Sequence, residues 1–170
     1  PEMVAAVSKI MRAQDLIAVA AKIEVVTKFR STIGLRGHMS TRNQPNHPAD
    51  DSRGIALSAL DGLLMGTGDA VIGVNPATDT VPDYIRICEV LELIRTQLDI
   101  PTQHCLLGHV STAIKAMEQN APVDLVFQSV AGSTKANLGF GVTLPMLDEA
   151  YDAAHSLGRA PAGSNLMYFE

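Results

Sequence analysis

The chain has 170 residues, of which 46% are hydrophobic, and its formal net charge at pH 7 is −5. This length suits one domain, and the apolar fraction suffices for a buried core. No apolar run reaches the ~18 residues that a membrane span needs, and no basic stripe with interleaved aromatic residues predicts nucleic-acid binding. The two cysteines, Cys88 and Cys105, lie in apolar segments. We predict that both are buried free thiols in a reducing compartment, and we predict no metal site.

The amino-terminal part of the chain has the periodicity of helices. Two helices are predicted, over residues 3–11 and 14–29. In the second, five residues recur at helical spacing: Leu16, Val19, Ala20, Ile23 and Thr27. Gly34 and Gly37 interrupt this pattern, and a short extended segment is predicted at residues 38–43.

From residue 50 onward, helical and extended segments alternate. Asp50 and Asp51 offer a helix N-cap, as does Thr80 with Pro82 after it. Helices with one apolar face are expected to begin near residues 51, 80, 110 and 144, the last after a loop over residues 131–141. Short apolar runs predict strands at four places: residues 69–74, 103–107, 125–127 and 166–169.

Strands that alternate with helices predict right-handed βαβ units and a parallel sheet. An open doubly wound sheet and a closed barrel both fit. The glycines of residues 66–68 precede a strand, and residues 132–135 lack P-loop spacing, which disfavours the nucleotide-binding forms of the open sheet. A barrel needs eight strands and about 250 residues. We therefore predict an α/β fold, a (β/α)8 TIM-type barrel incomplete here, with residues 1–170 in one domain: helices over 1–30, then βα units from about 38 to 170.

The predicted strands all end in polar residues, and in barrels the catalytic groups come from the carboxyl ends of different strands. These residues are Arg42 and Gln44, Asn75, His109, Gln128 and Ser129, and Glu170. A polar group at such a place must find a partner or face a cavity, so the set indicates a polar pocket. The alternative is that strands simply end where polarity begins. Arg42 and Gln44 share one strand face and could hold a hydroxyl and an amine, although Pro45 and Asn46 also suit a turn.

Two histidines lie near these strand ends. His47 could be a base or a ligand, but the acids at 50–51 favour a role in capping the next helix. His109 remains a candidate for chemistry. His104 alternates with Cys105 across a strand, so these two cannot share a metal on one face.

Four long motifs follow one another along the chain: residues 42–51 (RNQPNHPADD), 68–78 (GDAVIGVNPAT), 126–129 (VFQS) and 167–170 (MYFE). Together they resemble the large subunit of ethanolamine ammonia-lyase, over nearly the whole chain. The resemblance implies a β/α barrel that uses adenosylcobalamin (coenzyme B12) to convert ethanolamine to acetaldehyde and ammonia by a radical mechanism, as a carbon–nitrogen lyase. It implies a small subunit and further large subunits as partners, no nucleic acid or membrane, and the cytoplasm, free or within a bacterial microcompartment.

The resemblance also implies roles for individual residues. Arg42 and Gln44 would contact the substrate, Arg42 at its hydroxyl group, and Asn75 would touch it too. Glu170 would accept hydrogen bonds from the hydroxyl and the ammonium group. The residues toward the corrin ring or the adenosyl group would be Asn75, Pro76, Gln128, Ser129 and Phe140. Asn43 is expected to point away. The family's large subunit is much longer than 170 residues, so we expect this piece alone to be inactive.

Two other functions compete with the lyase. A barrel scaffold could keep the fold and the partner contacts without turnover, but it has no need for converging polar strand ends, which are costly if unpaired. An unrelated barrel lyase or aldolase would need a Schiff-base lysine in the barrel, whereas Lys115 and Lys135 lie on a predicted helix and loop. The converging polar strand ends argue against the scaffold, and the positions of the two lysines argue against the aldolase, so both observations favour the ammonia-lyase.

Overall fold

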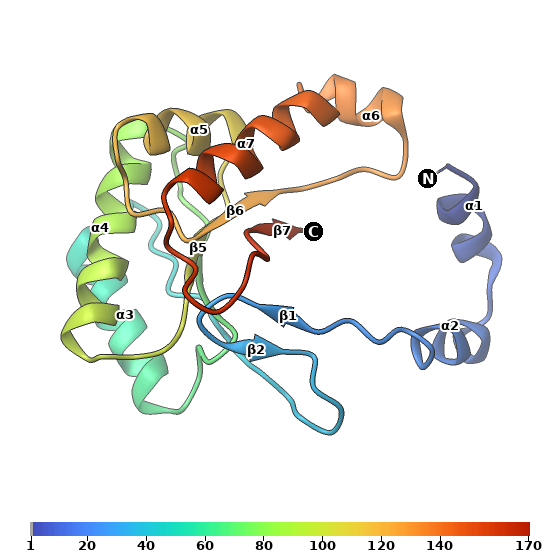
Figure 1. Ribbon diagram of the computed structural model, residues 1–170, viewed down its shortest axis with the longest axis horizontal. Helices are drawn as coiled ribbons and strands as arrows, with labels where there is room; N and C mark the ends of the chain where they lie inside the picture. The colour runs from blue at the N-terminus through green and yellow to red at the C-terminus, as the bar shows by residue number, and fades with distance from the viewer. Residues whose placement is uncertain (1) are drawn as a thin grey trace.

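A computed structural model describes residues 2–170, and a five-stranded parallel sheet forms its centre (Figure 1). Neighbouring strands follow chain order: β3 (Arg42–Asn43), β4 (Val71–Val74), β5 (His104–Leu106), β6 (Leu125–Gln128) and β7 (Met167–Phe169). The helices between them are α3 (Ser52–Leu64), α4 (Val81–Gln97), α5 (Val110–Glu118), α6 (Thr134–Gly139) and α7 (Leu144–Ser156). The predicted α/β fold, with parallel strands that alternate with helices as in an incomplete TIM-type barrel, is confirmed.

The main core lies between the sheet and the helix layer. Alternate strand residues such as Ile72, Leu106 and Val126 pack there against Ile87 and Leu91 of α4, and all five are at most 1% exposed. Fully burying each such side chain contributes about 1.5–3 kcal/mol. A smaller apolar cluster covers the other sheet face, as expected where successive strand residues point to opposite sides. Its buried members are Val71, Cys105 and Phe127.

Local capping signals fix where several helices begin. The Asp51 carboxylate accepts hydrogen bonds from the backbone N–H groups of Arg53 and Gly54, and the Thr80 hydroxyl accepts one from that of Asp83. These bonds satisfy N–H groups that have no partner within the helix. The caps predicted at Asp51 and Thr80 are therefore confirmed.

The amino-terminal segment differs from the prediction. After α1 (Glu2–Ile10) and α2 (Ala13–Ala20), the chain forms an antiparallel hairpin of β1 (Thr27–Lys28) and β2 (Thr32–Ile33). The helix predicted over 14–29 is thus wrong beyond Ala20, because the β-branched run at 25–27 favours extended backbone.

The loop predicted over 131–141 is also only partly right. It contains the short helix α6, whose first turn is capped by the Ser133 hydroxyl through the backbone N–H of Ala136. Both cysteines are buried and free, as predicted. No helix within residues 2–170 is long and apolar enough to cross a membrane.

The hairpin covers the amino ends of the strands. The Lys28 N–H donates to Asn165 Oδ1 at 2.7 Å, and the Arg30 and Ser31 N–H groups lie 3.3 Å from Gln103 Oε1. The Arg30 guanidinium pairs with Asp124. Since Gln103, Asp124 and Asn165 directly precede or lead into β5, β6 and β7, one hairpin ties three strands together at this end.

The isolated 170-residue chain should self-associate. Within the described residues, β3 and β7 are open sheet edges, which template pairing with other chains. Met3, Ile10 and Ile17 on α1 and α2 are at least 68% exposed. Size-exclusion chromatography with light scattering should therefore report oligomers or aggregates. A monodisperse monomer that melts cooperatively would contradict this expectation.

Candidate active site

Polar side chains converge at the carboxyl ends of β3 and β4. Gln44 Nε2 donates to Asn75 Oδ1 at 2.6 Å, and Arg42 Nη2 lies 3.3 Å from the same oxygen. The Asn75 backbone N–H donates to Asn46 Oδ1 at 2.8 Å. One amide therefore links both strand ends, and the predicted substrate residues Arg42, Gln44 and Asn75 lie together.

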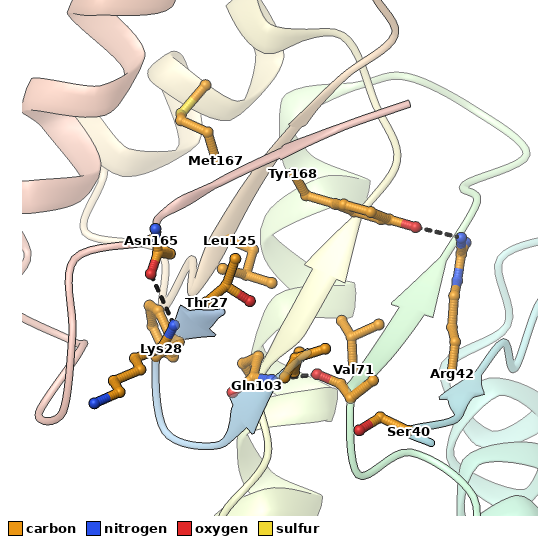
Figure 2. Close-up of a pocket in the computed structure, with 13 residues that line it drawn as sticks. Thr27, Lys28, Ser40, Arg42, Val71, Gln103, Leu125, Asn165, Met167 and Tyr168 are labelled. Carbon is orange, nitrogen blue, oxygen red and sulfur yellow. Dashed lines mark hydrogen bonds between the residues drawn. The ribbon is translucent and has the colours of Figure 1, made fainter. Parts of the chain in front are cut away.

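Glu170 joins this group from the far edge of the sheet. Arg42 Nη1 lies 3.3 Å from the Tyr168 hydroxyl oxygen and 3.8 Å from Glu170 Oε1, and Figure 2 shows Tyr168 reaching toward Arg42. In a flat sheet β3 and β7, with three strands between them, would lie about 19 Å apart. Side chains that leave one face roughly perpendicular to it meet only if the sheet curves. The contact thus reflects the curvature that a barrel requires.

The guanidinium group of Arg42 packs closely against the backbone of β4 at Gly73. A Cβ atom at Gly73 would lie 2.7 Å from Arg42 Nε, so the absence of a side chain there makes room for Arg42. Arg42 Nε is buried and has no hydrogen-bond partner among residues 2–170. The Glu170 side chain is 57% exposed, against 21% for Arg42, so the carboxylate remains accessible to a ligand.

The thiol below this site is not an activated nucleophile. Burial raises the pKa of Cys105 well above its usual range, although the nearby charge of Arg42 lowers it in part. A thiol in this state stays protonated and packs as a small apolar group. The chemistry of the site therefore rests on the guanidinium, carboxylate and amide groups.

The five residues predicted to contact the cofactor differ in their exposure to solvent. Asn75, Ser129 and Phe140 are exposed, and Pro76 is half-buried. Gln128 is buried on the helix side of the sheet, where its Oε1 accepts from the Val110 N–H at 2.9 Å and its Nε2 donates to the Ser129 carbonyl at 3.0 Å. The role of each of the five toward a cofactor stays a prediction. Asn43 points away from the site, as expected, and donates to the Ala59 carbonyl at 2.9 Å.

The two histidines near the strand ends organise turns. His47 Nδ1 accepts from the backbone N–H groups of Ala49 and Asp51 at 3.3 and 3.2 Å. His109 is the N-cap of α5, and its Nε2 lies 3.0 Å from the Phe140 carbonyl oxygen. His109 thus ties the loop that carries Phe140 to the end of β5.

Sequence reasoning missed the role of Asp50. This residue is buried, with a φ of 48° that non-glycine residues rarely adopt. Its two carboxylate oxygens accept from the N–H groups of Ala77 and Thr78 at 2.8 and 2.9 Å. Asp50 therefore fixes the loop that follows Asn75. Only the acidic pair at 50–51 signalled this, and its second member is the one that caps α3.

A second polar cluster lies toward the amino ends of the strands. Glu92, His104 and Asp124 offer three potential metal-ligand atoms within 4.8 Å of one another. The carboxylates are paired, however, with three guanidinium groups, those of Arg30, Arg95 and Arg159. Burial would raise the pKa of Glu92, but the His104 imidazole 3.7 Å away and the hydrogen bonds from Arg95 bring it below its ordinary value. With three cations already present, the cluster fits a buried ion-pair network better than a cation site.

Comparison with known proteins identifies the family. Residues 1–170 match the family model described as ethanolamine ammonia lyase large subunit. The chain belongs to this family. The ethanolamine ammonia-lyase large subunit of Escherichia coli (strain K12) is 47% identical over 169 residues, which cover 99% of this chain. The large subunit of Salmonella typhimurium (strain LT2) is 46% identical over the same length.

Membership of the ethanolamine ammonia-lyase large subunit family confirms the resemblance drawn from the four motifs. The chain spans 37% of the length of these curated relatives. Below, "full-length large subunit" denotes this sequence within a polypeptide of the relatives' length.

Proposed function

We propose that this chain supplies the substrate-contacting part of an adenosylcobalamin-dependent lyase that converts ethanolamine to acetaldehyde and ammonia. The observation that carries the proposal is the meeting of Arg42, Gln44, Asn75 and Glu170 at the carboxyl ends of the strands of the curved sheet. Ethanolamine has a hydroxyl group on one carbon and an ammonium group on the next. A guanidinium beside a carboxylate matches these two groups.

Each side chain has a distinct task in substrate binding. Glu170 accepts hydrogen bonds from the ammonium and the hydroxyl group, and Arg42 donates to the hydroxyl oxygen. Because Asn75 Oδ1 already accepts from Gln44 and Arg42, its amide nitrogen is left to donate to the substrate. Gln44 Oε1, whose own amide nitrogen is engaged, is left to accept from the ammonium group. These bonds hold the substrate in one orientation.

The residues near the strand ends fit a large amphiphilic cofactor. Phe140 and Val130 are 64% and 44% exposed and offer apolar surface, while Ser129, next to Val130, and Asn75, after β4, are exposed polar residues. A corrin ring, apolar on its faces and rimmed by amides, needs both kinds of surface. When bound, adenosylcobalamin supplies the radical chemistry. Asp50 and His109 keep the loops after Asn75 and around Phe140 in place for it.

The assembly follows from the same proposal. A reactive site of this kind must exclude water, so a small subunit and further large subunits cover the mouth of the barrel. Residues 1–170 form part of a single barrel domain, inactive as an isolated piece. The enzyme works in the cytoplasm, free or within a bacterial microcompartment, and without nucleic acid or membrane as a partner.

Acetaldehyde release tests the proposed function. The full-length large subunit with its small subunit should form acetaldehyde from ethanolamine only when adenosylcobalamin is added. A coupled assay for the aldehyde measures this directly. Cofactor binding without product would point instead to another substrate or a degenerate site. Failure to bind the cofactor would leave only the fold.

A further inference from the structure

We propose that Tyr168 is a positioning residue that keeps Arg42 from closing onto Glu170. The Tyr168 hydroxyl oxygen accepts a hydrogen bond from Arg42 Nη1, so that the Glu170 carboxylate stays available to the substrate ammonium group. The inference rests on the proposed function, because it takes Arg42 and Glu170 as the groups that bind ethanolamine. Nothing in the four sequence motifs assigns a role to the phenol.

The distances around Arg42 Nη1 carry the argument. The Tyr168 oxygen lies 3.3 Å away, and Glu170 Oε1 lies farther, at 3.8 Å. A tight pair between arginine and a carboxylate has N–O distances of about 2.7–2.9 Å. Tyr168 and Glu170 are two residues apart, so the extended chain of β7 points both toward Arg42. The phenol is thus the nearer partner.

Tyr168 does not depend on Arg42 for its own position. It pairs with Phe127 across β6 and β7, and the two rings pack edge to face with their centres 5.8 Å apart. Phe127 is buried in the inner apolar cluster. The Arg42 guanidinium carbon lies 5.9 Å from the centre of the Tyr168 ring, a distance at which the ring attracts the cation. Packing in the sheet therefore fixes the position of the Tyr168 phenol, and the phenol in turn fixes the position of the Arg42 guanidinium.

The other side of Arg42 is restricted too. Gly73 leaves just enough space for Nε, and Nη2 lies 3.3 Å from Asn75 Oδ1. Arg42 is therefore confined between the β4 backbone, the Asn75 amide and the phenol. Without the phenol oxygen, the strongest acceptor that residues 2–170 place within reach of Nη1 is the Glu170 carboxylate.

A tighter, hydrogen-bonded ion pair between Arg42 and Glu170, closer than the present 3.8 Å, would weaken substrate binding. Both groups are needed by ethanolamine, and each would satisfy the other instead. The substrate would have to break that pair before it could bind. Because the pair competes with binding and not with the later chemistry, its formation should raise KM more than it lowers kcat.

The test is Tyr168→Phe in the full-length large subunit, assembled with its small subunit. Phenylalanine keeps the ring packing and removes only the hydroxyl. KM for ethanolamine should rise about tenfold, the effect expected for a hydrogen bond to a charged group, while kcat changes by less than about twofold. Calorimetric binding of ethanolamine in the presence of hydroxocobalamin, which cannot start the reaction, should weaken by the same factor. Tyr151→Phe on α7 is the matched control and should leave KM unchanged.

A double variant separates positioning from general structural support. Glutamine cannot form an ion pair with Arg42, so in a Glu170→Gln background the loss of the hydroxyl should add less than about twofold to KM. Fully additive effects, or an unchanged KM in Tyr168→Phe, would overturn the proposal. Gly73→Ala should displace Arg42 by crowding Nε, and so raise KM even though the hydroxyl is present. If the unmodified protein bound no ethanolamine, the proposed function itself would be wrong. If the unmodified protein bound ethanolamine and the Tyr168→Phe variant bound it equally well, only the role of Tyr168 would be wrong.

Discussion

Replacing Glu170 with glutamine in the full-length large subunit should raise KM for ethanolamine about a hundredfold. The change keeps the size of the side chain and removes the carboxylate that residues 2–170 place beside Arg42. Hydrogen bonds to charged groups contribute about 1.5–3 kcal/mol each, and ~2.7 kcal/mol corresponds to a hundredfold loss of affinity. Steady-state kinetics with saturating adenosylcobalamin and small subunit would measure the effect.

Two controls make the Glu170 experiment specific. Glu149→Gln removes an exposed carboxylate on α7 and should leave KM unchanged. Ethylene glycol, used as a competitor that lacks the ammonium group, should lose less affinity for the Glu170→Gln variant than ethanolamine does. Kinetics identical to those of the unmodified enzyme would remove Glu170 from the substrate site.

Replacing Asp124 with asparagine should lower the free energy of unfolding by about 3–5 kcal/mol, which is the largest stability effect that we predict. The Asp124 side chain is fully buried and is bonded to both Arg30 and Arg159, so the asparagine variant leaves two guanidinium groups without this counter-charge. The effect should centre on the hairpin, because Arg30 belongs to its turn. Hydrogen exchange followed by mass spectrometry of the full-length protein should show faster exchange of the amides of residues 27–33.

The pH dependence of this cluster has a defined sign. Burial would raise the pKa of Asp124, but the charge of His104 and the bonds from Arg30 bring it below its ordinary value. A carboxylate with a lowered pKa stabilises the folded state above its unfolded pKa of about 3.9, and the gain is lost as pH falls through the folded value. Hairpin protection, corrected for intrinsic exchange, should therefore hold between pH 7 and pH 5. Equal protection in Asp124→Asn and in the exposed control Asp148→Asn would contradict the role of Asp124.

Local signals in the sequence suffice for most of the fold. Residues 71–74 are apolar without alternation, which is typical of a strand covered on both faces, and all four are buried. Thr80 and Asp51 mark helix starts through bonds to residues two or three positions away, so a short window contains the whole interaction. The order of strands follows because each βαβ connection places consecutive strands side by side.

Interactions between distant segments could not be predicted in this way. The Arg42–Tyr168 contact joins residues 126 positions apart, and it depends on the curvature of the sheet rather than on any local pattern. The hairpin was not predicted because Ile23 and Thr27 continue a helical spacing, whereas the contacts that stabilise the strand pair come from the distant residues Gln103, Asp124 and Asn165. Gln128 was expected among the groups of the polar pocket because it ends a strand, but strand alternation turns its side chain toward α5.

The hairpin also constrains the timing of folding during synthesis. Lys28 bonds to Asn165, 137 residues farther along, so during synthesis residues 27–28 must wait until those 137 residues have been added. At ~5–20 residues per second this delay is on the order of ten seconds. Until then Phe29 in the hairpin turn, which is buried in the main core of the folded chain, lacks its final neighbours. The nascent chain is therefore most exposed to aggregation, and most dependent on chaperones, before β7 has been made.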